Sequence, residues 1–142
     1  GTREEIINRF QGETDKSFIY LSGENVEVNR GEDYGIVFGI INTNAQGQEP
    51  TTFTYRTELA DNESEIRLLC GLDIQNVRSW VHFGDGSLVI ESGSDDAVPS
   101  IPISIKVPED APLCTAHFKI TIEKMNMRGI YDALNFTLNV TG

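Results

Sequence analysis

The two histidines, His82 and His117, are the side chains best suited to acid–base catalysis near neutral pH. His117 falls on the outward face of a predicted strand and His82 lies beside a predicted turn. The sequence contains no G-x-S-x-G elbow, no H-E-x-x-H pair and no glycine-rich phosphate loop. Paired carboxylates stay open as a route to glycoside hydrolysis, because any two of the 22 acidic residues can meet in space. We expect no catalytic residues and no enzymatic activity.

The acidic residues Asp85, Glu91, Asp95 and Asp96 are the candidates for a calcium site, since calcium prefers several carboxylate and carbonyl oxygens. Their spacing is not that of an EF-hand loop. The two cysteines are too few for a zinc cage, and neither has a histidine at ligand spacing. We therefore expect no metal site and no cofactor.

Cys70 and Cys114 lie at the end of one predicted strand and at the start of another, 44 positions apart. In an extracytoplasmic protein, a disulfide between them would restrict the unfolded chain and stabilise the fold by roughly 4 kcal/mol. Two buried free thiols are the alternative, and the sequence leaves both open.

Three N-x-S/T sequons begin at Asn62, Asn135 and Asn139. Asn135 and Asn139 fall on the outward face of the last predicted strand, where a glycan can be accommodated. A chain with this many asparagines, serines and threonines contains one or two sequons by chance. Glycosylation and chance occurrence are therefore both open.

Alternation of apolar and polar residues is the dominant pattern, and it predicts the strands that position these side chains. It is clearest in residues 101–107, 116–122 and 134–140, where every second residue is apolar. Pro102 predicts an edge position for the first of these strands. Further strands are predicted at residues 17–21, 26–28, 34–41, 53–59, 66–70, 77–83 and 88–91.

Eight to ten short strands predict an all-β fold, an immunoglobulin-like two-sheet antiparallel β-sandwich. The length of 142 residues indicates a single domain over residues 1–142. Residues 1–12 are expected to form an N-terminal extension, with a helical turn or two at 3–10, and residues 124–131 are the other place for such turns. Residues 42–50 are expected to form a long hairpin loop between two strands.

Residues 80–87 read W-V-H-F-G-D-G-S, which resembles the W-D-F-G-D-G signature of the polycystic-kidney-disease (PKD) family of extracellular β-sandwich domains. Val81 and His82 stand where that family has an aspartate. The alternative, which we favour, is a tight turn between two strands in which Gly84, Asp85 and Gly86 supply positive φ angles.

Residues 101–122 (IPISIKVPEDAPLCTAHFKITI) are similar to the second strand pair of CARDB and NPCBM-associated sandwich modules, and residues 34–59 to the first pair. Residues 112–116 (PLCTA) depart from the P-x-G-T-Y sequence usual there. The resemblance implies an immunoglobulin-like surface module of a bacterial or archaeal protein. It implies nothing about a ligand.

The formal charge of −11 repels nucleic acid and anionic lipids. No stretch is apolar enough to span a membrane, so membrane contact is expected only through an anchor outside this sequence. We expect an extracellular or cell-surface, non-catalytic domain, the ectodomain of a membrane-anchored prokaryotic surface or filament-associated protein. Its expected partners are envelope proteins or further copies of itself.

A carbohydrate-binding accessory module of a surface protein or secreted enzyme is the alternative function. Such a module needs exposed aromatic rings that stack on sugars. The candidate rings are Trp80, Tyr55 and Tyr131, although alternation places Tyr55 among the buried residues.

Overall fold

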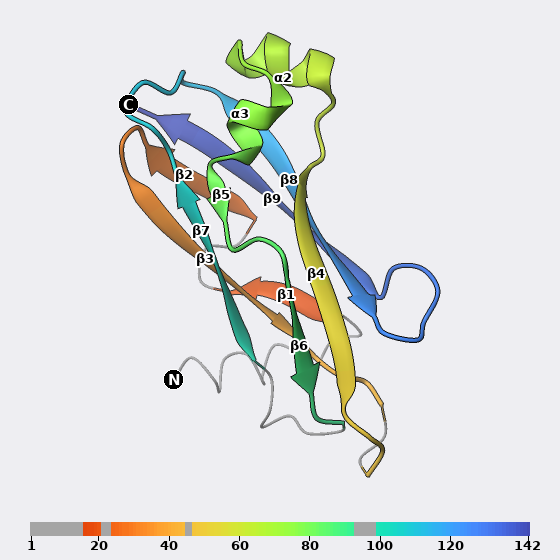
Figure 1. The fold of residues 1–142 in the computed structure, drawn as a ribbon. Coiled ribbons are helices and arrows are strands. Elements are labelled where there is room, and N and C mark those ends of the chain that lie inside the picture. Colours follow the sequence, from red (N-terminus) through yellow and green to blue (C-terminus); the bar gives the residue numbers. More distant parts are fainter. Residues whose placement is uncertain (1–15, 21–23, 45–46, 93–98) are drawn as a thin grey trace.

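The computed structural model describes residues 16–20, 24–44, 47–92 and 99–142, which form two β-sheets packed face to face (Figure 1). The expected N-terminal extension and its helical turns at residues 3–10 lie outside these ranges. No helix in the described part is long and apolar enough to cross a membrane. The elements are β1 (Ser17–Tyr20), β2 (Asn25–Asn29), β3 (Asp33–Ile40), β4 (Thr51–Leu59), α2 (Glu63–Cys70), α3 (Ile74–Arg78), β5 (Val81–His82), β6 (Gly86–Ile90), β7 (Ser100–Lys106), β8 (Thr115–Lys124) and β9 (Asp132–Thr141).

The strand order is that of an immunoglobulin-like sandwich. The first sheet has the order β1-β3-β7-β5 and the second has the order β2-β9-β8-β4-β6. Strands β1, β3, β7 and β5 take the places of A, B, E and D in the immunoglobulin fold, while β9, β8 and β4 take those of G, F and C. The predicted all-β two-sheet sandwich is therefore confirmed.

The second sheet is not wholly antiparallel, as the sequence had suggested, because β2 pairs with β9 in parallel. The physical reason lies at the start of the fold, where consecutive strands enter different sheets. Strand β1 pairs antiparallel with β3 in the first sheet, and a turn at residues 30–32 reverses the chain between β2 and β3. Strands β1 and β2 therefore run in the same direction, and β9 runs in that direction too, so β2 joins β9 in parallel.

Period-two alternation places the predicted inward residues in the core. In β7, β8 and β9 buried residues recur at every second position, with Thr121 of β8 buried in addition. In β4, Phe53 and Thr57 are buried, whereas Tyr55 and Leu59 on the same face are half-buried. Phe38 of β3 packs edge-on against Tyr55 of β4 with ring centroids 5.3 Å apart, which joins the two sheets. Phe118 and Phe136 stack on neighbouring strands at 5.1 Å.

Two segments predicted as strands contain helices instead. Residues 66–70 belong to α2, in which Ile66 and Cys70 are buried four positions apart, a helical spacing. Asn62 caps this helix and forms a capping box with Glu65, which is a helix-start signal. Residues 77–83 are divided between the end of α3, which Asp73 caps, and the two-residue strand β5.

The predicted hairpin loop at residues 42–50 is also wrong, because it joins strands of different sheets. Strand β3 pairs with β1 and β7, whereas β4 pairs with β8 and β6. Residues 125–131 contain turns but no helix. The edge position predicted from Pro102 is wrong for the strand as a whole, because β7 lies between β3 and β5. Pro102 is tolerated there because, among the described residues, β5 pairs only with Ile105 and Ser104 of β7.

Candidate interaction site

Helices α2 and α3 lie over one end of the sandwich, next to the start of β8 and the C-terminus (Figure 1). A disulfide joins Cys70, the last residue of α2, to Cys114, the residue before β8. Both residues are buried, and neither is a free thiol. The disulfide thus links the segment that contains α2 and α3 covalently to the second sheet.

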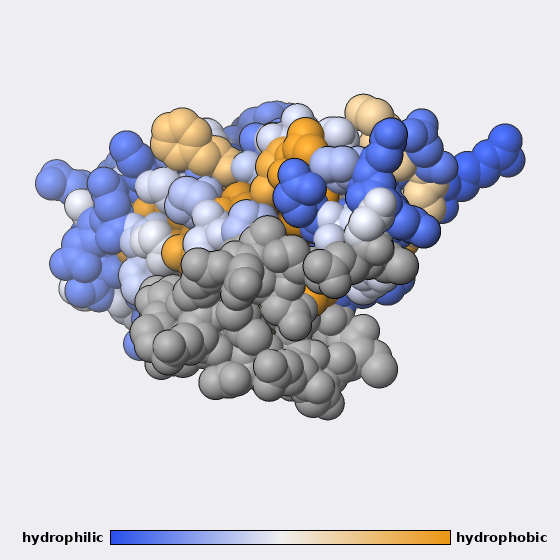
Figure 2. Space-filling view, turned by 90° about the horizontal axis from the view of Figure 1, so that it is seen from below, coloured by the Kyte–Doolittle hydropathy of each residue, from blue (hydrophilic) through white to orange (hydrophobic). Residues whose placement is uncertain are grey.

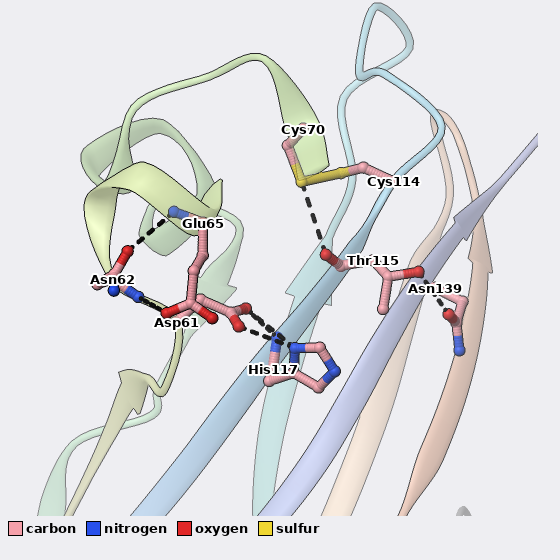
Figure 3. Close-up of polar contacts among 8 residues, drawn as sticks. All are labelled: Asp61, Asn62, Glu65, Cys70, Cys114, Thr115, His117 and Asn139. Atoms are coloured by element: carbon pink, nitrogen blue, oxygen red, sulfur yellow. Dashed lines mark hydrogen bonds and ion pairs between the residues drawn. A yellow bond between two sulfur atoms is a disulfide. The ribbon is translucent and has the colours of Figure 1, made fainter. Parts of the chain in front are cut away.

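Asp61 and His117 form a polar pair beside this disulfide (Figure 3). The buried Asp61 carboxylate accepts hydrogen bonds from the His117 backbone amide at 2.7 Å and from the ring Nδ1 at 2.9 Å. The Ala60 amide donates to the His117 carbonyl in the same place. Asp61 therefore closes the β4–β8 ladder where β4 ends, a contact across 56 positions that no spacing in the sequence indicates.

The two histidines lie on different sheets, His82 on β5 and His117 on β8. No hydrogen bond joins the Nε2 atom of His117 to another described residue. The described part of the chain also holds no group of three or more His, Cys, Asp or Glu side chains that suits a metal ion. Of the calcium candidates, Asp85 accepts a hydrogen bond from the Thr57 amide, and Asp95 and Asp96 lie outside the described residues.

The sequon asparagines lie at three surface positions, and their glycosylation stays a prediction. Asn62 is exposed at the start of α2, and its side-chain oxygen accepts from the Glu65 amide (Figure 3). Asn135 is exposed on β9. Asn139 is half-buried on β9, and its side-chain oxygen accepts from the Thr115 hydroxyl.

The three rings proposed for stacking on sugars do not form an exposed platform. Trp80 and Tyr131 are buried, and the Tyr131 hydroxyl donates to the Ile41 carbonyl. Tyr55 is half-buried, and burial, with a smaller effect of the Asp85 carboxylate, raises the pKa of its hydroxyl. All three side chains pack in the core or against it. The prediction that these rings are exposed for stacking on sugars is therefore wrong.

A different aromatic ring, that of Phe83, is 76% exposed. Phe83 lies in the corner formed by residues 83–86, where the chain leaves β5 of the first sheet and enters β6 of the second. The predicted turn between two strands is therefore a crossing between sheets. The positive φ angle predicted for its glycines occurs at Phe83 instead, at 61°.

Gly84 and Gly86 are needed in this corner because the chain approaches β4 closely. A Cβ atom on Gly84 would lie 2.8 Å from the Cβ of Thr57, and one on Gly86 would lie 2.5 Å from the Tyr55 hydroxyl oxygen. The Thr57 hydroxyl donates to the Gly84 carbonyl at 2.7 Å, and the Thr57 amide donates to the Asp85 carboxylate at 3.0 Å. The corner is thus fixed to β4.

Strand β6 forms an edge of the second sheet and pairs only with β4 in the described part of the chain. Its sequence, GSLVI, carries no charge, and the outward side chain of Val89 is 65% exposed. Native edge strands usually carry charges or prolines, because unpaired amides and carbonyls attract other strands. Strand β2 at the opposite edge follows this rule, with Glu27 exposed at its centre.

The free edge of β6 presents the backbone groups of Ser87 and Val89. Across the β4–β8 pair, the Met125 amide donates to the Thr52 carbonyl at 2.9 Å, so Thr52 turns its backbone groups toward β8. Val89 lies opposite Thr52 on the other side of β4. Because pairs in an antiparallel ladder alternate, Val89 and Ser87 turn their amides and carbonyls away from β4.

Exposed apolar residues gather at two further places. Leu68, Leu69 and Leu113 lie around the disulfide, and Met125, Met127 and Ile130 lie in the connection between β8 and β9. The view from below in Figure 2 shows apolar side chains between polar ones at the end of the sandwich opposite the helices. These scattered side chains do not by themselves define a site, since single exposed apolar residues are normal on soluble proteins.

No model of a known protein family matches the sequence, and neither does any curated protein. Among solved structures, the chain is similar to part of a family 123 glycoside hydrolase from Clostridium perfringens, with a TM-score of 0.61 and 14% identity over 99% of this chain. The match spans 25% of the length of the hydrolase chain. The chain is also similar to an ASH/PapD-like domain of human CEP192, with a TM-score of 0.52, 12% identity and coverage of 89% of this chain and 84% of that one. At these identities the similarity establishes the fold alone, a two-sheet β-sandwich of the immunoglobulin-like kind.

Proposed function

We propose that this domain is a non-catalytic interaction module of a prokaryotic cell-surface protein, which binds an extended segment of another envelope protein at β6. The observation that carries the proposal is the uncharged edge of β6, which pairs with no strand other than β4 among the described residues. The bound segment pairs with the outward amides and carbonyls of Ser87 and Val89, as in β-strand addition. The exposed Val89 side chain packs against a side chain of the added strand.

The disulfide supports an extracytoplasmic location, because disulfides persist mainly in oxidising compartments. The acidic surface agrees with protein partners rather than nucleic acid. The similarity of residues 101–122 to CARDB and NPCBM-associated modules supports the same assignment. An anchor outside this sequence then holds the domain at the membrane.

The backbone of β6 provides a specific test. In a Val89→Pro variant the lost amide is one that faces away from β4, so the β4–β6 ladder keeps its hydrogen bonds while the free edge loses a donor. The matched control is Val89→Thr, which keeps both the amide and the branched side chain.

The immobilised domain is incubated with solubilised envelope proteins, and the captured protein is identified and purified. We expect wild type and Val89→Thr to bind this protein alike, and Val89→Pro to bind it at least tenfold more weakly with an unchanged melting temperature. Hydrogen exchange should show protection of the Ser87 and Val89 amides in the complex. Equal binding by a folded Val89→Pro variant would exclude strand addition at β6.

Binding of a second copy of this domain at β6 must be distinguished from binding of another envelope protein. Light scattering after size exclusion measures whether the domain alone forms dimers or larger species that Val89→Pro dissolves. Such species would identify a second copy as the occupant of the edge. A strictly monomeric domain that captures nothing would contradict the proposed function.

A further inference from the structure

The Phe83 corner combines two features that are unfavourable for a folded protein. The backbone of Phe83 has a φ of 61°, a conformation that non-glycine residues other than Asn and Asp rarely adopt. Its ring is 76% exposed although it is wholly apolar. Such conformations persist where the surroundings enforce them, and they concentrate at functional sites.

The surroundings of Phe83 do enforce its conformation. Both the carbonyl of Gly84 and the carboxylate of Asp85 are hydrogen-bonded to Thr57, a buried residue of β4. Gly84 itself is buried against Thr57 and Val81. Phe83 is therefore presented by a rigid corner rather than by a flexible loop, so little ordering is needed when its ring is covered.

Beside the ring lies a hollow of about 220 Å³, lined by Thr57, Arg78, Val81, Phe83, Gly84 and Asp85. Among the described residues, Arg78 forms no ion pair, and the Oδ2 atom of Asp85 accepts no hydrogen bond. The hollow thus has an apolar ring, together with a guanidinium and a carboxylate oxygen that have no partner among the described residues. Its volume is below the roughly 300 Å³ at which pockets for drug-sized ligands begin, which suits a single small ring.

We propose that this corner binds one neutral sugar ring at the end of a glycan. The apolar C–H face of the sugar stacks on Phe83, while two neighbouring hydroxyl groups donate to the Asp85 carboxylate and accept from the Arg78 guanidinium. The polar lining disfavours an apolar protein side chain as the occupant. The Asp85 carboxylate and the charge of −11 disfavour acidic sugars and phosphate. This site is separate from strand addition at β6 and does not depend on it.

The test uses an array of neutral oligosaccharides that differ in their terminal sugar, followed by titration calorimetry with the strongest binder. Phe83→Asn removes the ring and replaces it with a residue that suits a positive φ. Phe83→Trp keeps a ring, and Arg78→Gln removes the guanidinium from the surface of α3. Glu27→Gln is the control outside the hollow, because Glu27 is exposed on β2 at the opposite edge of the second sheet.

We expect wild type, Phe83→Trp and Glu27→Gln to bind the same terminal sugar, with Phe83→Asn losing detectable binding and Arg78→Gln binding at least tenfold more weakly. The melting temperature of Phe83→Asn should not fall, which separates loss of the ligand contact from loss of the fold. An empty array for wild type would overturn the proposal, as would undiminished binding by Phe83→Asn. If the array is empty and Phe83→Asn instead weakens capture of an envelope protein, the corner belongs to the protein-binding surface.

Discussion

The connection from β4 to β6 contains two parts that are built in opposite ways. The helical part, residues 60–79, has a capping box at Asn62, a capped second helix and a disulfide at Cys70. The corner at residues 83–86 places Phe83 in an unfavourable backbone conformation and exposes its ring. The helical part is stabilised by its helix caps and the disulfide, whereas the corner is held in its conformation by hydrogen bonds to Thr57 of β4.

Residues of the helical part therefore stabilise the fold, whereas Phe83 has an unfavourable conformation that lowers its stability. Substitutions in the helical part, and at the glycines that seat the corner, should destabilise the protein. Replacement of Phe83 by asparagine, which suits a positive φ angle, should instead stabilise it. The sign of the change in the free energy of unfolding therefore tests this contrast between the two parts more sharply than the size of the change does.

Replacing both cysteines, as Cys70→Ala with Cys114→Ala, should have the largest effect. The disulfide closes a loop with a sequence separation of 44, and its removal should lower the free energy of unfolding by about 4 kcal/mol. Urea denaturation of the variant and of wild type measures this, and wild type with a reducing agent should behave like the variant. A loss below about 1 kcal/mol would mean that the helical part is held by its other contacts.

The second expected effect is that of Gly84→Ala, which should lower the free energy of unfolding by about 1 to 3 kcal/mol. The added methyl group would lie 2.8 Å from the Cβ of Thr57, a buried residue whose branched side chain has little freedom to move. Gly35→Ala is the matched control, because Gly35 lies in β3 with nothing within 4 Å of its added Cβ. Thermal unfolding of both variants gives the comparison. Equal melting temperatures would show that the corner accommodates the added methyl group without loss of stability.

The sequence predicted the fold class and most strands, because strands with one buried face show their alternation directly. Strands β8 and β9 are examples in which each predicted inward position from Ala116 to Ile122 and from Phe136 to Val140 is buried. The helices were missed because α2 and α3 are short. The cap residues Asn62 and Asp73 were their available signal.

Alternation also indicates which side of a strand is buried but not which sheet the strand joins. This explains why alternation predicts turns between paired strands at residues 42–50 and 84–86, although each segment crosses between sheets. At the candidate site, the pair Cys70 and Cys114 was visible as the chain's two cysteines. The pairing of Asp61 with His117 and the exposure of Phe83 depend on the three-dimensional fold, so no spacing indicated them.

The smallest expected effect is the one with the opposite sign. Phe83→Asn should raise the free energy of unfolding by up to about 1 kcal/mol, because an L-residue pays on the order of 1–2 kcal/mol for a left-handed conformation and asparagine pays less. The lost ring contributes little packing, since it is 76% exposed. Urea denaturation measures the change, and Phe83→Leu is the control, an apolar residue that should keep the strain. A destabilised Phe83→Asn variant would mean that the ring stabilises the corner, and the contrast between the two parts of the connection would then fail.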